Sequence, residues 1–285
     1  MTEPLPPVLC YPLGVDTVNT RVLECGDGDD VVVLLHGAGS RADRFRPILA
    51  PLAARGRHVY AVDFPGHGFA SKGADYPYGT PAFARFVSQL LDILDIERLA
   101  LVGTSLGAHV AACIACEQPD RVTSLVLVGA TGIIPRAPDS AGSSARIANT
   151  TLEGIRDKLV FLVHDPSLVT DSWVREEARF NSSPGAADAL AGVFRYLATD
   201  IDADLVATRL ASTPVPVLLI WGAGDKWIPA DVALATADAL GSPPLVFLAA
   251  AGHAPYFERP EAFVDVLDEF LRAPAGFPRG VQTIE

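Results

Sequence analysis

The sequence predicts a doubly wound α/β protein with a mostly parallel sheet, and three observations lead to that class. Short apolar runs alternate with helix-like segments along most of the chain. The runs are continuously apolar, which is typical of parallel strands because helices cover both faces of such a sheet. The chain has 285 residues, 49% of them hydrophobic, which is ample for a large buried core. Together these features indicate β-α-β alternation.

Six apolar runs are the expected strands of this sheet. They lie at residues 31–36, 58–63, 99–103, 124–129, 215–222 and 244–250. Helical patterning follows or separates them at residues 80–95, 105–118, 230–240 and 260–272. Residues 8–24 should add one or two antiparallel strands at an edge. Residues 273–285, APAGFPRGVQTIE, are rich in glycine and proline and are interpreted as a loosely held tail.

One interval, from about residue 131 to residue 213, contains no strong strand pattern. The segments DKLVFLVH, SWVREEARF and AADALAGVFRYLA have short amphipathic helical patterns and are joined by Gly, Ser and Pro. An insertion of this size between two strands predicts a helical cap over their carboxyl ends, where α/β proteins bind ligands. We therefore expect a core of residues 1–130 and 214–285, a cap of residues 131–213, and a flexible entry to the cap at residues 135–149.

Charge and cysteine content narrow the classes of partner and compartment. The net charge is −12, from 22 basic and 34 acidic side chains, which argues against nucleic-acid binding and attraction to an anionic membrane. The N-terminus has no secretory-signal pattern, so a cytoplasmic protein is expected. The apolar span Leu99 to Cys116 is broken by polar residues and predicts a strand followed by a helix. Cys113 and Cys116 lie inside that helix and are interpreted as core residues.

The stretch Gly103-Thr104-Ser105-Leu106-Gly107 places a serine hydroxyl at a sharp turn between a strand and a helix. Such a turn strains the backbone of its central residue, and small neighbours two positions away on either side avoid a collision. The geometry would expose the Ser105 hydroxyl at the carboxyl end of the sheet. The pattern G-x-S-x-G in this context is the nucleophile elbow of serine hydrolases.

A serine nucleophile needs an imidazole to take its proton and a carboxylate to fix the imidazole tautomer. Asp225 follows the run VPVLLIWGAG, and His253 follows PLVFLAAAG, so both are expected at strand ends. Asp231 is the rival for the carboxylate, and Asp225 is preferred because it lies in the Gly-x-Gly-Asp turn directly after the strand.

Five motifs extend a family resemblance from about Val31 to Leu271: LLHGAGS, DFPGHGFAS, GTSLG, WGAGDKWIP and GHAPYFERPEAF. In this order they resemble the α/β-hydrolase superfamily. The resemblance implies that Ser105 is the nucleophile, His253 the general base and acid, and Asp225 its orienting carboxylate.

The same resemblance implies an oxyanion hole made by two backbone N–H groups. One belongs to Leu106, next to the nucleophile, and the other to Ala38, in the loop of residues 36–39. His36 is expected to brace this loop through hydrogen bonds, and His67 lies in a turn that matches the PGHG corner of the family.

A serine at position 105 implies acyl transfer to water, because haloalkane dehalogenases and epoxide hydrolases of the superfamily use an aspartate there. The first interpretation is hydrolysis of a carboxylic ester or lactone of a hydrophobic small molecule. The second is hydrolysis of a carbon–carbon bond in a vinylogous diketone acid, because FLVHDPSLVTDSWVREEARFNSSPGA resembles the cap of the meta-cleavage-product hydrolases. The third, from another class, is a triad-bearing protein that binds a ligand without turning it over.

Three positions separate the first two interpretations. The meta-cleavage-product hydrolases have Asn before the nucleophile, Trp after the catalytic histidine, and a cap arginine that pairs with the substrate carboxylate. The corresponding residues here are Thr104, Ala254 and Glu177. These departures place the ester or lactone first.

Further candidate substrate contacts come from the elbow, the oxyanion loop, the cap and the histidine loop. They are Gly39, Thr104, Trp173, Arg175, Arg179 and Ala254. Apolar cap side chains such as Trp173 and Phe180 favour a small hydrophobic substrate. The mechanism requires no cofactor, and the histidine spacing predicts no metal site. The sequence leaves the oligomeric state open, a homo-oligomer included.

Overall fold

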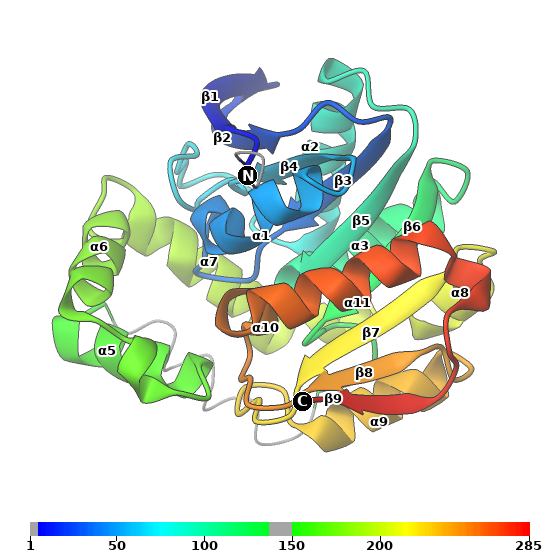
Figure 1. The fold of residues 1–285 in the computed structure, drawn as a ribbon. Helices are drawn as coiled ribbons and strands as arrows, with labels where there is room; N and C mark the ends of the chain where they lie inside the picture. Colours follow the sequence, from blue (N-terminus) through cyan, green and yellow to red (C-terminus); the bar gives the residue numbers. More distant parts are fainter. Residues whose placement is uncertain (1–4, 137–149) are drawn as a thin grey trace.

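The computed structural model describes residues 5–136 and 150–285, and within them a nine-stranded sheet forms the centre of the molecule (Figure 1). The strand order is β1-β2-β4-β3-β5-β6-β7-β8-β9. From β4 to β9 all neighbours are parallel, whereas β2 is antiparallel to both β1 and β4. The strands are β1 Val8–Val15, β2 Val18–Cys25, β3 Asp30–Leu35, β4 Arg57–Val62, β5 Leu99–Thr104, β6 Val122–Val128, β7 Val217–Gly222, β8 Leu245–Leu248 and β9 Val281–Ile284.

Helices cover both faces of the sheet, as a doubly wound fold requires. The α-helices are α1 Arg46–Ala53, α2 Thr80–Ile93, α3 Leu106–Glu117, α5 Leu152–Leu162, α6 Asp171–Asn181, α7 Ala186–Thr199, α8 Ala207–Ala211, α9 Ala230–Ala239, α10 Pro255–Glu258 and α11 Pro260–Arg272. The 3₁₀ turns are η1 Ala42–Phe45, η3 Pro166–Leu168, η4 Ile201–Ala203 and η5 Pro274–Gly276.

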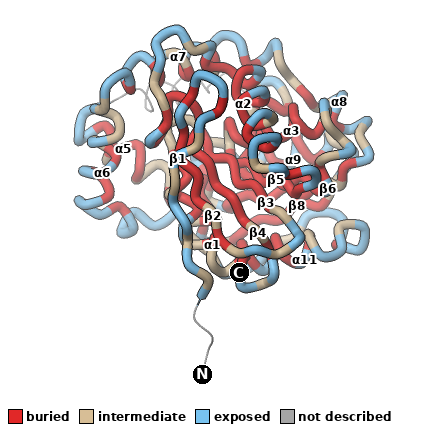
Figure 2. The backbone as a smooth tube through the Cα atoms, turned by 90° about the horizontal axis from the view of Figure 1, so that it is seen from above, coloured by how far each residue is buried: buried red, intermediate tan, exposed pale blue. Residues whose placement is uncertain are grey.

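The core consists of two layers separated by the sheet. One layer joins α2, α3 and α9 to the sheet, and the other joins α1 and α11 to its opposite face. Successive residues of one strand serve both layers: Val33 and Leu35 belong to the first, Val32 and Leu34 to the second. This period of two explains why the central strands are apolar throughout and buried (Figure 2).

The predicted fold class is confirmed, and each of the six apolar runs contains or overlaps a parallel strand, from β3 to β8. Residues 8–24 contribute two antiparallel strands, β1 and β2, at one edge of the sheet, where one or two such strands were expected. Residues 99–116 form β5 followed by α3, as expected from their polar interruptions. Within the described residues no helix is long and apolar enough to cross a membrane.

The prediction of a loosely held C-terminal tail was wrong. Residues 281–284 form β9, which pairs in parallel with β8 at the edge of the sheet. The aromatic ring of Phe277 is buried against Phe270 and anchors the turn that leads to this strand. The four residues VQTI are too few to give a strand pattern that stands out in a segment rich in Gly and Pro. Helix α1 was also not predicted, because Pro47 and Pro51 interrupt its pattern.

The helices inserted between β6 and β7 divide into two groups. Helices α5 and α6 pack on each other through their own cluster, which includes Ile155, Leu159 and Trp173, and they project from the side of the core (Figure 1). Helices α7 and α8 contribute to the main core layer that contains α3. The cap boundaries at residues 131 and 213 stay a prediction, and residues 137–149 of the expected cap entry lie outside the described residues.

Candidate active site

Ser105 lies on a sharp turn between β5 and α3, at the carboxyl end of the sheet. Its backbone has φ 53° and ψ −118°, a strained conformation for a residue with a side chain. A Cβ on Gly103 would lie 2.2 Å from the carbonyl oxygen of Gly107, and one on Gly107 would lie 2.3 Å from that of Leu35. The two flanking glycines are therefore required by close backbone packing, which fixes the direction of the Ser105 side chain.

Asp225 and His253 form a hydrogen-bonded pair beside this turn. The Nδ1–H of His253 donates to Oδ2 of Asp225 at 2.7 Å, and the other carboxylate oxygen accepts from the backbone N–H groups of Trp227 and Ile228. These contacts leave Nε2 of the imidazole free to accept a proton. Gly129 follows β6 with φ +49°, and a Cβ there would lie 3.0 Å from the His253 ring.

The loop that carries His253 is hydrogen-bonded to α5 and to α10. The backbone N–H of His253 donates to the carbonyl of Leu162, the last residue of α5, at 2.8 Å. The Glu258 carboxylate of α10 accepts from the N–H of Gly252, in the His253 loop, and from the N–H of His164, just after α5. The position of the imidazole therefore depends on the docking of α5.

The loop after β3 lies beside the turn that carries Ser105, with a Cβ on Gly37 falling 3.0 Å from the Ser105 Cβ. The Nδ1–H of His36 donates to the Gly37 carbonyl at 2.8 Å, and its Nε2 accepts from the N–H of Phe64. His36 thus braces the loop as expected. The loop closes a turn from the Ser40 N–H to the Gly37 carbonyl, which does not use the N–H of Ala38. Leu106 is the first residue of α3, so its N–H has no intrahelical acceptor.

Sheet topology brings these loops together. Strand β3 pairs with β4 on one side and β5 on the other, so the strand order reverses between β3 and β5. Loops that leave the carboxyl ends of strands on the two sides of such a point diverge and form a crevice. The loop of Ala38 follows β3 and Ser105 follows β5, so the candidate oxyanion donors and the nucleophile meet at this point.

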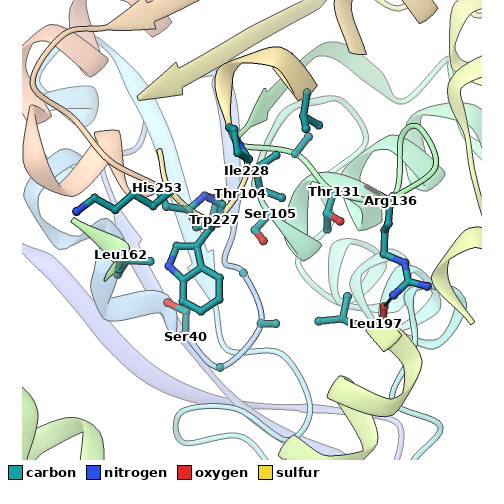
Figure 3. Close-up of a pocket in the computed structure, with 18 of the residues that line it drawn as sticks. Ser40, Thr104, Ser105, Thr131, Arg136, Leu162, Leu197, Trp227, Ile228 and His253 are labelled. Atoms are coloured by element: carbon teal, nitrogen blue, oxygen red, sulfur yellow. Dashed lines mark hydrogen bonds between the residues drawn. The ribbon is translucent and has the colours of Figure 1, made fainter. Parts of the chain in front are cut away.

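A cavity of about 310 Å³ opens over Ser105. It is lined by the loop after β3, the turn at Ser105, the His253 loop, residues 130–136, and helices α5 and α6. In the view of Figure 3, Leu162 and His253 lie on one side of Ser105, and Arg136 and Leu197 lie on the other. Most of the wall is apolar, as expected for a site that binds a small organic molecule. In the described part of the chain the Ser105 hydroxyl makes no hydrogen bond to His253, and such bonds often shorten only when substrate binds.

One part of the cavity wall is charged. Glu177 of α6 accepts from Lys158 Nζ at 3.0 Å through one oxygen, and from Arg41 at 2.7 Å and Arg44 at 3.0 Å through the other. The Arg44 guanidinium also stacks 4.1 Å from the Trp173 ring centroid. Burial opposes ionisation of Glu177, but Lys158, Arg44 and Arg41 outweigh it and lower its pKa to about 2. The carboxylate is therefore ionised at neutral pH.

The candidate substrate contacts separate into three groups. Gly39 and Thr104 line the cavity. Trp173 and Ala254 are buried but are not part of its lining: Trp173 supports Arg44 from behind, and Ala254 packs into the core. Arg175 and Arg179 are exposed on α6, and the structure does not bring them to the cavity.

Sequence reasoning did not select Arg44, Lys158 and Trp227, which line the cavity. Trp227 carried a signal, because it lies two residues after Asp225 in the motif WGAGDKWIP. Arg44 and Lys158 carried none, since charged residues on amphipathic helices are usually solvated. Their position is evident only once α5 and α6 are folded against the oxyanion loop.

The rings of three further histidines, His58, His67 and His109, have hydrogen-bond partners outside the cavity, and His58 Nε2 pairs with Glu24. His67 Nδ1–H donates to the Pro65 carbonyl, and buried His109 bridges Thr80 and the carbonyl of Asp204. Over residues 5–136 and 150–285, no group of three or more His, Cys, Asp or Glu side chains is arranged to hold a metal ion.

Known proteins resemble this chain in sequence and in fold. The family model for the alpha/beta hydrolase fold matches residues 30–213. A 2-hydroxy-6-oxononadienedioate/2-hydroxy-6-oxononatrienedioate hydrolase of Escherichia coli strain K12 is 29% identical over 268 residues, which are 90% of this chain and 92% of the relative.

Two solved structures are similar over most of their length. The 2-hydroxy-6-oxo-6-phenylhexa-2,4-dienoate hydrolase BphD of Rhodococcus sp. strain RHA1 has a TM-score of 0.85 and 26% identity, and the match covers 94% of this chain and all of that one. A bacterial membrane phospholipase A has a TM-score of 0.85 and 25% identity, with 94% and 87% covered. Since the family model spans more than half of the chain, the protein belongs to the α/β-hydrolase fold family and is a hydrolase.

Proposed function

We propose that this hydrolase cleaves a carbon–carbon bond next to a ketone in an acid of the 2-hydroxy-6-oxo-dienoate type. The observation that carries the proposal is a mostly apolar cavity over Ser105 with two buried cations, Arg44 and Lys158, in its wall. Such a cavity suits an organic acid with an apolar remainder. The Escherichia coli and Rhodococcus relatives, by their names, hydrolyse acids of this type.

In this mechanism the Ser105 oxygen attacks the ketone carbon while His253 Nε2 accepts the hydroxyl proton. Asp225 holds the imidazole tautomer and stabilises the charged ring. The N–H groups of Leu106 and Ala38 stabilise the oxyanion of the tetrahedral intermediate.

Collapse of that intermediate breaks the carbon–carbon bond. The acid reacts as its 2-oxo tautomer, in which the 2-hydroxyl proton has moved to the carbon that will leave. The electron pair of the broken bond then delocalises into this conjugated 2-ketone, and the resulting dienolate oxygen takes the proton from His253. Water, deprotonated by the same imidazole, then cleaves the ester between the acyl group and Ser105. The products are a carboxylic acid and a shortened hydroxydienoate, and the net reaction consumes one water.

Hydrolysis of a carboxylic ester or lactone is the second candidate, and specific residues favour it. Thr104, Ala254 and Glu177 differ from the Asn, Trp and Arg of the meta-cleavage-product hydrolases. The similarity to a phospholipase A, whose reaction cleaves an ester, points the same way. The same triad chemistry applies, with an alkoxide as the leaving group instead of a carbon fragment.

The test compares the protein with its Ser105→Ala variant on three substrate classes: nitrophenyl esters of increasing acyl length, lactones, and a vinylogous 1,5-diketone acid. We expect the diketone acid to have the highest kcat/KM, and the variant to lose roughly 10⁴-fold or more. Faster turnover of an ester or lactone would favour the second candidate. Turnover that survives in the folded Ser105→Ala variant would exclude Ser105 as the nucleophile.

A further inference from the structure

Glu177 lies at the centre of the charged wall, which consists of Arg44, Lys158 and Glu177, and the wall has more positive than negative charges. Of the side chains that line the cavity there, Arg44 and Lys158 are cations and Glu177 is an anion. Their side chains are 8%, 9% and 2% exposed, so water screens these charges little.

The third cation, Arg41, is neutralised elsewhere. Besides Glu177 it pairs with Asp43 at 3.2 Å and with the exposed Glu176 at 3.0 Å, and it does not line the main cavity. The charged wall of Arg44, Lys158 and Glu177 therefore retains one uncompensated positive charge.

The other charged groups of the lining are directed to other partners. Arg136 is paired with Asp202 and with the Leu197 carbonyl, and Lys226 is exposed to solvent. On the same side of the cavity, the described lining includes the apolar side chains of Ile133, Ile134 and Leu197. A second carboxylate placed there would lose its hydration without an unpaired cation from residues 5–136 or 150–285.

We infer that Glu177 sets the charge that this pocket accepts: the charged wall binds a single carboxylate and disfavours two negative charges. The inference rests on the proposed function, since it specifies the acid as a monocarboxylic acid with an apolar acyl side. It assigns to Glu177 the opposite role from that of an arginine at this position. Glu177 holds Arg44 and Lys158 in place and cancels one of their charges, whereas an arginine would add a further charge.

The experiment measures equilibrium binding to the Ser105→Ala variant, so that it is independent of which bond the enzyme cleaves. The probes are octanoate, its neutral isostere octanamide, and hexylmalonate, which carries two carboxylates on one carbon. The fluorescence of Trp173 and Trp227, beside and within the cavity, reports binding. We expect octanoate to bind roughly tenfold tighter than either of the other two probes.

Adding Glu177→Gln removes the negative charge at nearly constant volume. We expect hexylmalonate to gain roughly tenfold relative to octanoate, because Coulomb attraction grows with ligand charge. Glu176→Gln is the matched control: it also removes a carboxylate bound to Arg41, but outside the cavity, and should leave the ratio unchanged.

Two outcomes would overturn the inference: equal binding of octanoate and octanamide, or an unchanged hexylmalonate to octanoate ratio in the folded Glu177→Gln protein. If Glu177→Gln does not fold, Lys158→Met replaces it and should abolish the preference for octanoate over octanamide. A retained preference would again contradict the inference. Cleavage of the diketone acid without any preference for octanoate would refute the charged wall alone. The preference without cleavage would refute the carbon–carbon reaction alone.

Discussion

Two regions of the site are built in different ways: the carboxyl end of the sheet, which carries Ser105, Asp225 and His253, and the charged wall around Glu177. At the carboxyl end of the sheet, backbone geometry at strand ends places each side chain. A Cβ at Gly103 or Gly107 would collide with a backbone oxygen, and one at Gly129 would crowd the His253 ring. In the charged wall, side chains from distant segments hold one another: Arg44 and Glu177 are 133 residues apart. Local motifs therefore fix the positions of the three side chains at the carboxyl end of the sheet, while the charge of the wall can change without altering them.

Loss of the Asp225 carboxylate should have the largest effect on kcat. Asp225→Asn keeps the shape but favours the wrong imidazole tautomer, so we expect kcat to fall roughly 10⁴-fold. Asp231→Asn is the matched control, because Asp231 is exposed on the first turn of α9 and caps only its own neighbour. Steady-state kinetics on the best substrate measure both. A larger loss in Asp231→Asn would transfer the role to that residue.

Crowding the triad without removing any of its groups should have the next largest effect. A methyl group at Gly129 would lie 3.0 Å from the His253 ring and 3.2 Å from Asp225 Oδ2, so Gly129→Ala should displace the pair and lower kcat roughly 100-fold. Gly241→Ala serves as control, since Gly241 has a similar positive φ with no atom within 4 Å of a Cβ. It should change stability but leave kcat close to wild type. Equal kcat losses would mean that backbone strain, and not contact with His253, is responsible.

Lowering the pH should reduce the free energy of unfolding in two separate pH ranges, the higher one set by buried histidines of the core. Burial lowers the pKa of His36 to about 4 and that of His67 to about 3, so both are neutral in the folded core. Unfolded histidines bind protons below about pH 6.5, so stability should be complete above that pH and fall as the pH decreases toward 4. At pH 5.5 the expected loss is roughly 1 kcal/mol per histidine, measured by urea unfolding.

The contribution of Glu177 to the free energy of unfolding should be lost at a lower pH than that of the histidines. Its pKa, about 2 when folded, lies below the ordinary value near 4.5, so its stabilisation is present above pH 4.5 and is lost as the pH falls toward 2. Wild type and Glu177→Gln should therefore show the same loss between pH 7 and 5.5. A stability that is flat or rises over that interval would contradict the assignment of neutral buried histidines.

The smallest effect is expected at the beginning of the helix that carries Glu177. The Thr170 hydroxyl accepts from the Trp173 N–H at the N-terminus of α6, so Thr170→Ala should destabilise the helix by about 1 kcal/mol. Thr170→Ser retains the oxygen and should restore the wild-type urea midpoint within error. Equal destabilisation by Ser and Ala would show that the methyl group, not the cap, matters.

Much of the fold was predictable because parallel strands are uniformly apolar and their helices are amphipathic. Predictions failed where this signal is short or interrupted, as in α1 with its two prolines and β9 with four residues. The arrangement of Ser105, Asp225 and His253 was predictable because each follows a strong strand within a local motif.

The sequence by itself determined the chain order of the triad, the glycines that its backbone requires, and the position of the inserted helices, because each depends on neighbouring residues. Only the tertiary structure decided which charges face the cavity over Ser105. The sequence predicts Arg175 and Arg179 at the pocket, but both are exposed, whereas Arg44 and Lys158 converge there on Glu177. Their meeting depends on how α5 and α6 dock against the loop after β3, and that docking is a long-range packing result with no periodic signature in the chain.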